Sequence, residues 1–518
     1  MTGGLLKSTL LISANTTLSR ILGLVRDVVI ARYFGAGTGM DAFIVAFRIP
    51  NFLRRLFAEG GFSQAFVPVL AEYRERRTRE EVQALVDHTS AILGVALFGV
   101  TVLGVLCAPV VVLVFAPGFA GDADKQELTA ALLRVTFPYI FFISLTALAG
   151  GILNTYRKFG VPAFTPVFLN LSMIAAAIWL APRMERPVES LAWGVFIAGV
   201  VQLLFQIPFL RQLHLLPRPR LGRDREGVGR ILKLMMPTLF GVSVTQINLL
   251  VDTQVASFLV TGSISWLYYS DRLVEFPLGV FGIALATVIM PSLSAEHARN
   301  STQGYAETLD WALRWVFLIS LPAALGLAYL SGPALATLFQ YREFSPYDVE
   351  MAAISLMAFA SGLPAYVLIK ILVSGTVSRQ DTRTPVRAGV IALISNIIFI
   401  LLLYRPLAHA GLALATAISS YINAGILYVH LQRHGGLQLQ AGWSTHLLRI
   451  CVALAVMLLV LQVISPPLDQ WLAWPAQDRI QRLALCVAGG AVGYFAALRV
   501  TGMTLREMLG RHGTEPRP

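Results

Sequence analysis

Apolar runs of about twenty residues recur along the whole chain, each long enough to cross the hydrocarbon core of a bilayer. The composition agrees, since 56% of the 518 residues are hydrophobic and 14% are charged, whereas soluble domains carry about a quarter charged residues. Helices satisfy their own backbone hydrogen bonds in lipid, and the sequence lacks the alternating short segments of a transmembrane β-barrel. It therefore predicts an all-α membrane protein with many spans.

About fourteen transmembrane helices fit this pattern. The expected spans are 5–34, 38–72, 82–116, 126–152, 162–182, 188–211, 228–260, 264–293, 305–331, 347–378, 385–404, 409–431, 444–465 and 480–502. The first has no small-residue cleavage site after a short apolar core, so we interpret it as a retained helix and not as a signal peptide. Five prolines are candidate kinks: Pro50, Pro68, Pro138, Pro277 and Pro364.

Lysine and arginine gather in alternate loops, which predicts one orientation. The basic segments YRERRTRE, TYRKFG, PRPRLGRDR and SRQDTRTPVR all fall on the side of the N-terminus, so both termini are expected in the cytoplasm. The net charge of +12 is thus explained by topology and does not indicate nucleic acid binding. The cysteines Cys107, Cys451 and Cys486 lie in apolar spans and are expected to be buried, without a disulfide framework.

An internal repeat divides the chain. Matching residues recur at one spacing: Pro68 with Pro291, Glu72 with Glu296, Pro162 with Pro385, and Asp27 near the position of Asp252. The period corresponds to six spans, and an even number of spans predicts two lobes in parallel orientation. We expect an N-lobe at 1–222, a C-lobe at 223–435, and two further helices with a cytoplasmic tail at 436–518.

Three expected helices carry arginine at membrane depth on a polar stripe. Polar residues at steps of three and four share one helical face. In the first span they are Thr9, Ser13, Thr16, Arg20, Gly23 and Asp27, with Ser19 and Arg26 beside them. In the second span they are Asp41, Arg48, Arg55 and Glu59, with Asn51 and Arg54 adjacent. In the eighth they are Tyr268, Arg272, Glu275, Gly279 and Gly282, and Ser265 is a further polar lining residue.

Arginine facing lipid is too costly for this arrangement to be accidental. One arginine at the bilayer centre costs about 2.5–3.5 kcal/mol, so six would cost roughly 15 kcal/mol, which matches or exceeds the net stability of most proteins. Simple ion pairs are the alternative for single residues: Arg26 with Asp27, Arg272 with Glu275, and Arg55 with Glu59. The whole set predicts a central cationic cavity, and the planar guanidinium group favours a phosphate ligand.

Asp252 indicates a second kind of site. It follows Asn248 on a polar stripe of the seventh span, and Asn396 and Thr416 of later spans could approach it. A carboxylate among neutral oxygens suits coupling to Na⁺ or H⁺. The other interpretation is a protonated or hydrogen-bonded aspartate between helices, and the sequence leaves both open.

The sequence carries no catalytic signature. It has no P-loop, nucleophile elbow, HExxH motif or paired catalytic carboxylates, so we expect a transporter without a cofactor. His430 and His434 are four residues apart but lack a third metal ligand. Asp310 and Arg314 share the same spacing and are expected to form an ion pair.

Several long motifs resemble the MurJ (MviN) family, bacterial lipid II flippases of the multidrug/oligosaccharidyl-lipid/polysaccharide exporter superfamily. They are SRILGLVRD, GAGTGMDAFIVAFRIPNFLRRLFAEGGFSQAFVPVLAEY, ILNTYRKFGVPAF, YYSDRLVEFPLGVFGIALATVIMPSLS and SRQDTRTPV. The resemblance implies two six-helix lobes, two C-terminal helices and a lipid-facing groove. The family's cavity residues fall on Arg20, Arg26, Asp27, Asp41, Arg48, Arg54, Arg55, Arg272 and Glu275. Asp252 and Asn396 resemble a sodium site, although Ile400 stands where that site has a carboxylate.

The resemblance also implies a function. Lipid II, the undecaprenyl-pyrophosphate-linked peptidoglycan precursor, would move by alternating access from the cytoplasmic to the outer leaflet of the bacterial inner membrane. The carrier would act as a monomer beside other cell-wall synthesis proteins, and membrane potential, Na⁺ or H⁺ would reset it. Alternatives are an exporter of another polyprenyl-pyrophosphate-linked saccharide or of drugs, and a membrane scaffold. A cation exporter should instead line its cavity with carboxylates, and a scaffold has no need of buried arginines.

Overall fold

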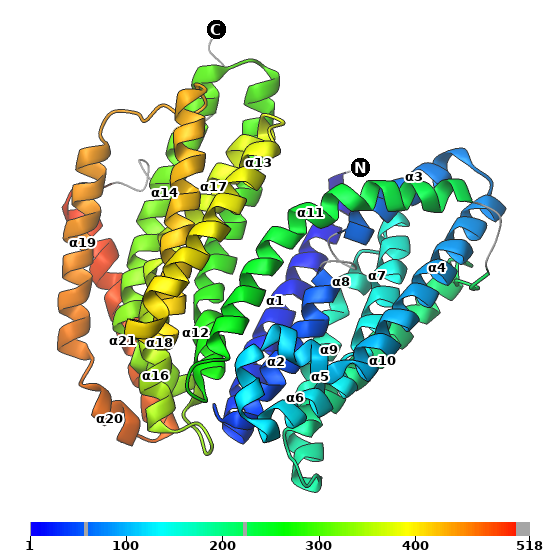
Figure 1. Ribbon diagram of the computed structural model, residues 1–518. Coiled ribbons are helices and arrows are strands. Elements are labelled where there is room, and N and C mark those ends of the chain that lie inside the picture. The colour runs from blue at the N-terminus through cyan, green and yellow to red at the C-terminus, as the bar shows by residue number, and fades with distance from the viewer. Residues whose placement is uncertain (1, 56–60, 221–224, 504–518) are drawn as a thin grey trace. The chain divides into compact units, whose positions relative to one another are not determined.

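The computed structural model describes residues 2–55, 61–220 and 225–503, and these residues form helices and connecting turns without any β-strand (Figure 1). Ten of the described helical segments are long and apolar enough to cross a membrane. The all-α prediction is confirmed. The count of about fourteen spans stays a prediction, because one helical segment, Arg383–Arg433, covers two expected spans.

The chain divides into two compact units. The first comprises Met1–Ser265 and Tyr341–Phe344, and the second comprises Trp266–Gln340 and Ser345–Pro518. This division by packing differs from the lobes expected at 1–222 and 223–435, because helix α11 (Arg225–Ala256) packs against α3, α4 and α5 of the first unit. The repeat itself, and the lobes defined by it, stay predictions.

The first unit contains α11 and the ten helices that precede it. These are α1 (Thr2–Phe34), α2 (Thr38–Leu53), α3 (Ser63–Arg76), α4 (Arg79–Leu106), α5 (Ala108–Phe115), α6 (Ala123–Thr136), α7 (Tyr139–Thr155), α8 (Gly160–Phe164), α9 (Pro166–Ala175) and α10 (Glu189–Gln212). A buried cluster joins α3, α4 and α7, with Phe66, Val86 and Ile152 fully inaccessible. Helix α10 packs against α6, α7 and α9, and α1 packs against α8 and α9.

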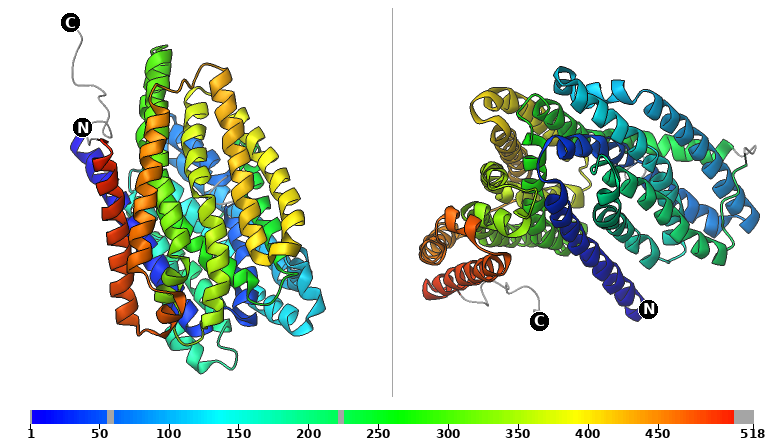
Figure 2. Two further views of the ribbon diagram at one scale, coloured as in Figure 1. Left: turned by 90° about the vertical axis from the view of Figure 1, so that its left-hand side faces the viewer. Right: turned by 90° about the horizontal axis from the view of Figure 1, so that it is seen from below.

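The second unit contains most of α12 (Ser263–Pro277) and all later helices. These are α13 (Ile283–Ala298), α14 (Thr302–Tyr329), α15 (Ser331–Phe339), α16 (Pro346–Ser361), α17 (Leu363–Ser378), α18 (Arg383–Arg433), α19 (Trp443–Ile464), α20 (Leu468–Ala473) and α21 (Ala476–Val500). Helices α19 and α21, orange and red in Figure 2, lie side by side. They pack on α14 and α15 through a buried cluster that includes Ile450, Trp471 and Tyr494.

Helix breaks fall where the sequence places prolines or small residues. Pro138 separates α6 from α7, Pro364 follows the break between α16 and α17, and Pro277 ends α12 before a π-helical turn (Leu278–Gly282). Three of the five candidate kinks thus coincide with a helix boundary, whereas Pro50 and Pro68 lie inside α2 and α3. In α18 the backbone is non-helical at Ala408 (φ 47°, ψ −128°), between the expected spans 385–404 and 409–431.

Apolar side chains remain exposed on these helices, which is what a lipid-covered surface requires. In the most apolar stretch of α19 only 22% of the residues are buried, and the side chain of Val463 is 86% exposed.

The expectation that all cysteines are buried was wrong, because only Cys486 is inaccessible while Cys107 and Cys451 are exposed. An apolar span can turn a residue toward lipid as easily as toward the core, and sequence position alone does not distinguish the two.

Candidate functional site

The stripe on α1 centres on a buried ion pair. Arg26 and Asp27 are 8% and 2% exposed. The Nε and Nη2 atoms of Arg26 donate to Oδ1 of Asp27 over 2.9 and 2.7 Å, and Nη1 donates to Oδ1 of Asn170 on α9 over 3.1 Å. Asn170 Nδ2 in turn donates to the carbonyl oxygen of Ser19 over 3.0 Å. The guanidinium plane is therefore fixed by two helices.

Arg20 lies on the same helix in a different setting. It is exposed, and among the described residues it forms no hydrogen bond or ion pair. Ser19 is half-buried and is engaged through its carbonyl group. Helix α1 thus carries one buried arginine, Arg26, which is bonded to Asp27 and Asn170, and one exposed arginine, Arg20.

Asp41, in the first turn of α2, binds the start of α12. Its Oδ2 accepts from Lys125 Nζ over 3.0 Å and from the backbone N–H of Gly262 over 2.8 Å. Its Oδ1 accepts from the N–H and the hydroxyl of Ser265 over 3.0 and 2.7 Å. Lys125 also lies 4.5 Å from the ring centroid of Phe119. All four donors converge on a carboxylate that is 1% exposed, so α2, α6 and the start of α12 are held by one charged group.

The end of α2 carries arginines bonded to neutral oxygens. Arg48 Nη1 donates to Thr253 Oγ1 on α11 over 2.8 Å, and Arg54 Nε donates to Asn51 Oδ1 over 3.1 Å. Arg55 is exposed. The predicted partner of Arg55, Glu59, lies outside the described residues.

On α12 the predicted pair is formed. Arg272 Nη1 lies 2.6 Å from Glu275 Oε2, and the guanidinium carbon is 4.9 Å from the ring centroid of Tyr268. The two charged side chains are 31% and 49% exposed. The pair is therefore partly accessible, unlike the buried pair of Arg26 with Asp27.

The structure supports the ion-pair alternative for Arg26 and Arg272 and shows neutral oxygens at Arg48 and Arg54. Since Arg272 and Glu275 belong to the second unit, a cavity shared with the arginines of the first unit stays a prediction.

Three contact residues were missed from the sequence: Lys125, Asn170 and Thr253. Asn170 is a lone amide inside an apolar run, and Thr253 adjoins Asp252, so each left a signal in the sequence. Lys125 resembled ordinary loop charge in DADKQELT. It is positioned by the cap of α6, where its N–H donates to Asp122 Oδ1 over 3.0 Å.

The predicted cation site is divided between the units. Asp252 lies on α11 and is half-buried, while Asn396 and Thr416 lie on α18 of the second unit. The Thr416 hydroxyl donates to the carbonyl oxygen of Leu412 over 3.1 Å, and Ile400 is 1% exposed. Among the described residues no cluster of three or more His, Cys, Asp or Glu side chains could hold a metal ion. Amide and hydroxyl ligands lie outside that criterion, so the Na⁺ site stays a prediction.

Comparison with known proteins gives consistent results. The family model "Lipid II flippase MurJ" matches residues 30–473. A Vibrio cholerae serotype O1 protein named probable lipid II flippase MurJ is 48% identical over 511 residues, covering 97% of each chain. A solved structure of a lipid II flippase MurJ in an inward closed conformation matches with a TM-score of 0.81 at 27% identity, covering 95% of this chain and 98% of that one.

A more distant protein shares the same helical architecture. An inward-facing multidrug resistance MATE family transporter of the MOP superfamily has a TM-score of 0.67 at 15% identity, over 82% of this chain and 98% of its own. At that identity the likeness concerns the helical architecture alone.

Proposed function

Since this chain belongs to the MurJ lipid II flippase family, we propose that it carries lipid II across the bacterial inner membrane, from the cytoplasmic to the outer leaflet. The observation that carries the proposal is the family match over residues 30–473, a range that contains the arginine-bearing segments of α2 and α12. The chain is a transporter and not an enzyme.

The pyrophosphate of lipid II would be bound by arginines at membrane depth. Guanidinium groups form two parallel charge-assisted hydrogen bonds to phosphate oxygens. Arg48 donates to Thr253 Oγ1 and Arg54 donates to Asn51 Oδ1, and a phosphate would offer each guanidinium group a charged acceptor in place of a neutral oxygen. Arg272 pairs with Glu275 and its side chain is 31% exposed, so the group is partly accessible to a ligand.

Both termini are placed in the cytoplasm in this proposal, because the basic loops then lie inside. Resetting of the empty carrier would draw on the membrane potential, which supplies about 2.3 kcal/mol per elementary charge per 100 mV. A cation at Asp252, either Na⁺ or H⁺, is the alternative source of coupling.

The test is lipid II translocation in reconstituted vesicles. Arg26→Ala and Arg272→Ala are expected to abolish translocation while both variants still insert and purify as folded protein. Arg26→Lys keeps the charge but loses the planar fork, so its rate should fall as well. Arg186→Ala, an exposed loop position, is the matched control and should translocate at the normal rate. Normal flipping by Arg272→Ala would refute its role in binding the pyrophosphate, and normal flipping by Arg26→Ala would refute the expectation that Arg26 belongs to the substrate cavity.

Substrate choice needs a separate measurement. Competition between lipid II and a polyprenyl-pyrophosphate lipid with an unrelated saccharide distinguishes this flippase from an exporter of other lipid-linked sugars. We expect lipid II to be preferred, and equal competition would favour the broader exporter.

A further inference from the structure

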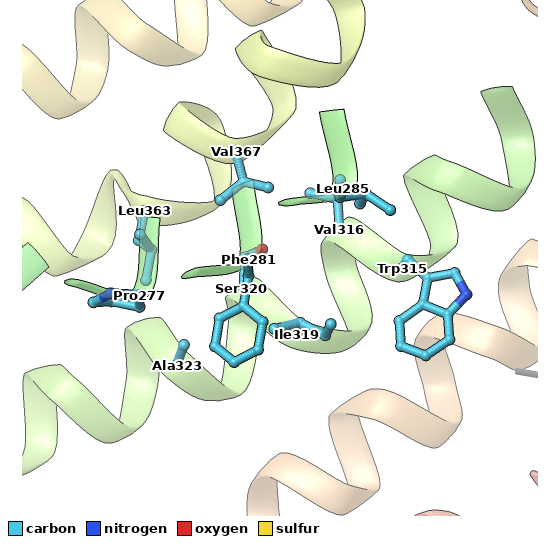
Figure 3. A pocket seen from close by; sticks show the side chains of 10 residues that line it. All are labelled: Pro277, Phe281, Leu285, Trp315, Val316, Ile319, Ser320, Ala323, Leu363 and Val367. Atoms are coloured by element: carbon cyan, nitrogen blue, oxygen red, sulfur yellow. The ribbon is translucent and has the colours of Figure 1, made fainter. Parts of the chain in front are cut away.

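Two hollows of the second unit lie between packed helices. One is an apolar pocket of about 40 Å³ lined by Pro277, Leu363 and side chains of α14 (Figure 3), which is too small for a substrate. The other, of about 640 Å³, has Asp310 and Arg314 in its wall. Asp310 Oδ2 lies 2.8 Å from Arg314 Nε, so the predicted ion pair is confirmed, and Asp310 Oδ1 accepts from Trp443 Nε1 over 2.6 Å. These contacts hold the start of α19 against α14, and neither hollow selects a particular ligand.

The segment between α15 and α16 has a different character, because the chain changes units twice within it. Tyr341–Phe344, which we call the strap, packs with the first unit, whereas Gln340 and Ser345 on either side of it belong to the second. The carbonyl oxygen of Gln340 accepts from Arg479 Nη1 over 3.1 Å, and the Ser345 hydroxyl caps α16 by accepting from the Asp348 N–H over 3.2 Å. The residues that flank the strap are therefore fixed within the second unit.

The strap lies against the end of α1, within the first unit. Gly35 follows the last residue of α1 with φ +61°, and a Cβ atom at this position would collide with the Glu343 carbonyl oxygen. The Glu343 N–H donates to the Arg32 carbonyl oxygen over 3.4 Å, and the guanidinium carbon of Arg342 lies 5.8 Å from the ring centroid of Tyr33. Glycine at position 35 thus permits both the left-handed backbone and the close approach of the strap.

This contact is specific in shape but weak in its polar interactions. A hydrogen bond of 3.4 Å is long, and a cation–π contact contributes little where the cation is exposed, as Arg342 is. Phe344 supplies the buried part of the strap and is only 1% exposed. A contact of this kind can break and re-form while the helices of both units stay folded.

The place of the strap gives it a mechanical consequence. In the orientation proposed above, the end of α1 and the segment between α15 and α16 lie at the outer face. Alternating access requires that face to open once in each cycle. As long as the strap stays on α1, the end of the helix that carries Arg20 and Arg26 is tied to a chain segment whose flanks are fixed in the second unit.

We propose that the strap is an outer-face clasp, which is docked on Gly35 while the carrier is closed to the outside and released from α1 when it opens. The inference rests on the proposed function, because a carrier that works by alternating access needs this release. It assigns Gly35, Tyr33, Arg342 and Glu343 to the conformational cycle, and none of them to substrate binding.

Tethering the strap tests whether release is required. In the full chain with Cys107→Ser and Cys451→Ser, the changes Tyr33→Cys and Arg342→Cys place thiols on the two residues whose side chains now meet. A reducible bifunctional thiosulfonate should join them and abolish lipid II translocation in vesicles, and reduction should restore it. A monofunctional thiosulfonate of matched size is the control and should leave most of the translocation intact. Full translocation by the tethered protein would overturn the proposal.

Hydrogen exchange of the strap amides tests docking without any substrate. Gly35→Ala should quicken their exchange about tenfold, because the new methyl group displaces the Glu343 carbonyl. Gly37→Ala is the matched control, since its Cβ position is open and its φ of −94° suits alanine, and it should exchange like the wild type.

A second variant covers the case in which Gly35→Ala does not fold. Arg342→Ala removes only the exposed guanidinium group over Tyr33 and should also quicken exchange of the strap. Wild-type exchange in both Gly35→Ala and Arg342→Ala would overturn the docking on α1. Absence of translocation before tethering, with exchange altered as expected, would count against the proposed function and leave the docking of the strap supported.

Discussion

The carboxylate of Asp41 offers the sharpest test of the packing in the first unit. Asp41→Asn keeps the shape of the side chain, but an amide NH₂ at the Oδ2 position would face the donors Lys125 Nζ and Gly262 N–H. Two hydrogen bonds to a charged acceptor, observed at 3.0 and 2.8 Å, would be lost. At about 1.5–3 kcal/mol each, the loss is about 3–6 kcal/mol, which agrees with about 3–5 kcal/mol for breaking a buried ion pair.

A double-mutant cycle isolates the ion pair. In Asp41→Asn the ammonium of Lys125 remains buried, whereas Lys125→Met removes that charge and keeps most of the aliphatic stem. The double variant should therefore lose less than the sum of the single changes, with a coupling of about 2 kcal/mol. Reversible unfolding in mixed detergent micelles gives the free energies. The exposed neighbour Asp124→Asn is the control, expected within about 0.5 kcal/mol of wild type. Strict additivity of the two changes would refute the reasoning.

Three further changes test other parts of the fold. Gly35 has φ +61° and its Cβ position would collide with the Glu343 carbonyl oxygen, so Gly35→Ala should lower the unfolding free energy by about 1–3 kcal/mol in the same assay. Arg479 is 7% exposed and donates to three backbone carbonyl oxygens. Arg479→Met should therefore lower the free energy of unfolding by about 3 kcal/mol, which thermal unfolding would show as a lower midpoint temperature. Burial opposes the ionisation of Asp381, but hydrogen bonds from the side chain and N–H of Thr384 outweigh it and hold the pKa of that carboxyl below its ordinary value. Its stabilisation is therefore present above about pH 4 and lost as the pH falls further, so Asp381→Asn should cost about 1 kcal/mol at neutral pH and nothing in acid, measured by unfolding across pH.

Sequence reasoning predicted helices and several of their ends, because hydropathy and proline act locally. Pro138 and Pro364 marked real breaks. The break at Cys107 between α4 and α5 was missed, although Pro109 in the first turn of α5 was available as a signal. A run of uniformly apolar residues hides such a break, since both halves satisfy the same hydropathy criterion.

The site was predictable only along single helices. Adjacency in the sequence suggested a pair of Arg26 with Asp27, and helical spacing suggested one of Arg272 with Glu275, and both pairs are formed. Contacts across the chain, such as Lys125 with Asp41 at a separation of 84 residues, depend on tertiary packing that no local pattern encodes. Whether residues of different units meet at one ligand depends on tertiary arrangement as well, and periodicity carries no information about it.

The two exposed thiols make the molecule a ready subject for spectroscopy. Cys107 belongs to the first unit and Cys451 to the second, while Cys486 is shielded from reagents. Thiol-directed spin labels or fluorophores in detergent would attach at one native point on each unit, without an engineered background. The interprobe distance, followed with and without substrate, would then test whether the two units rearrange as the expected alternating access requires.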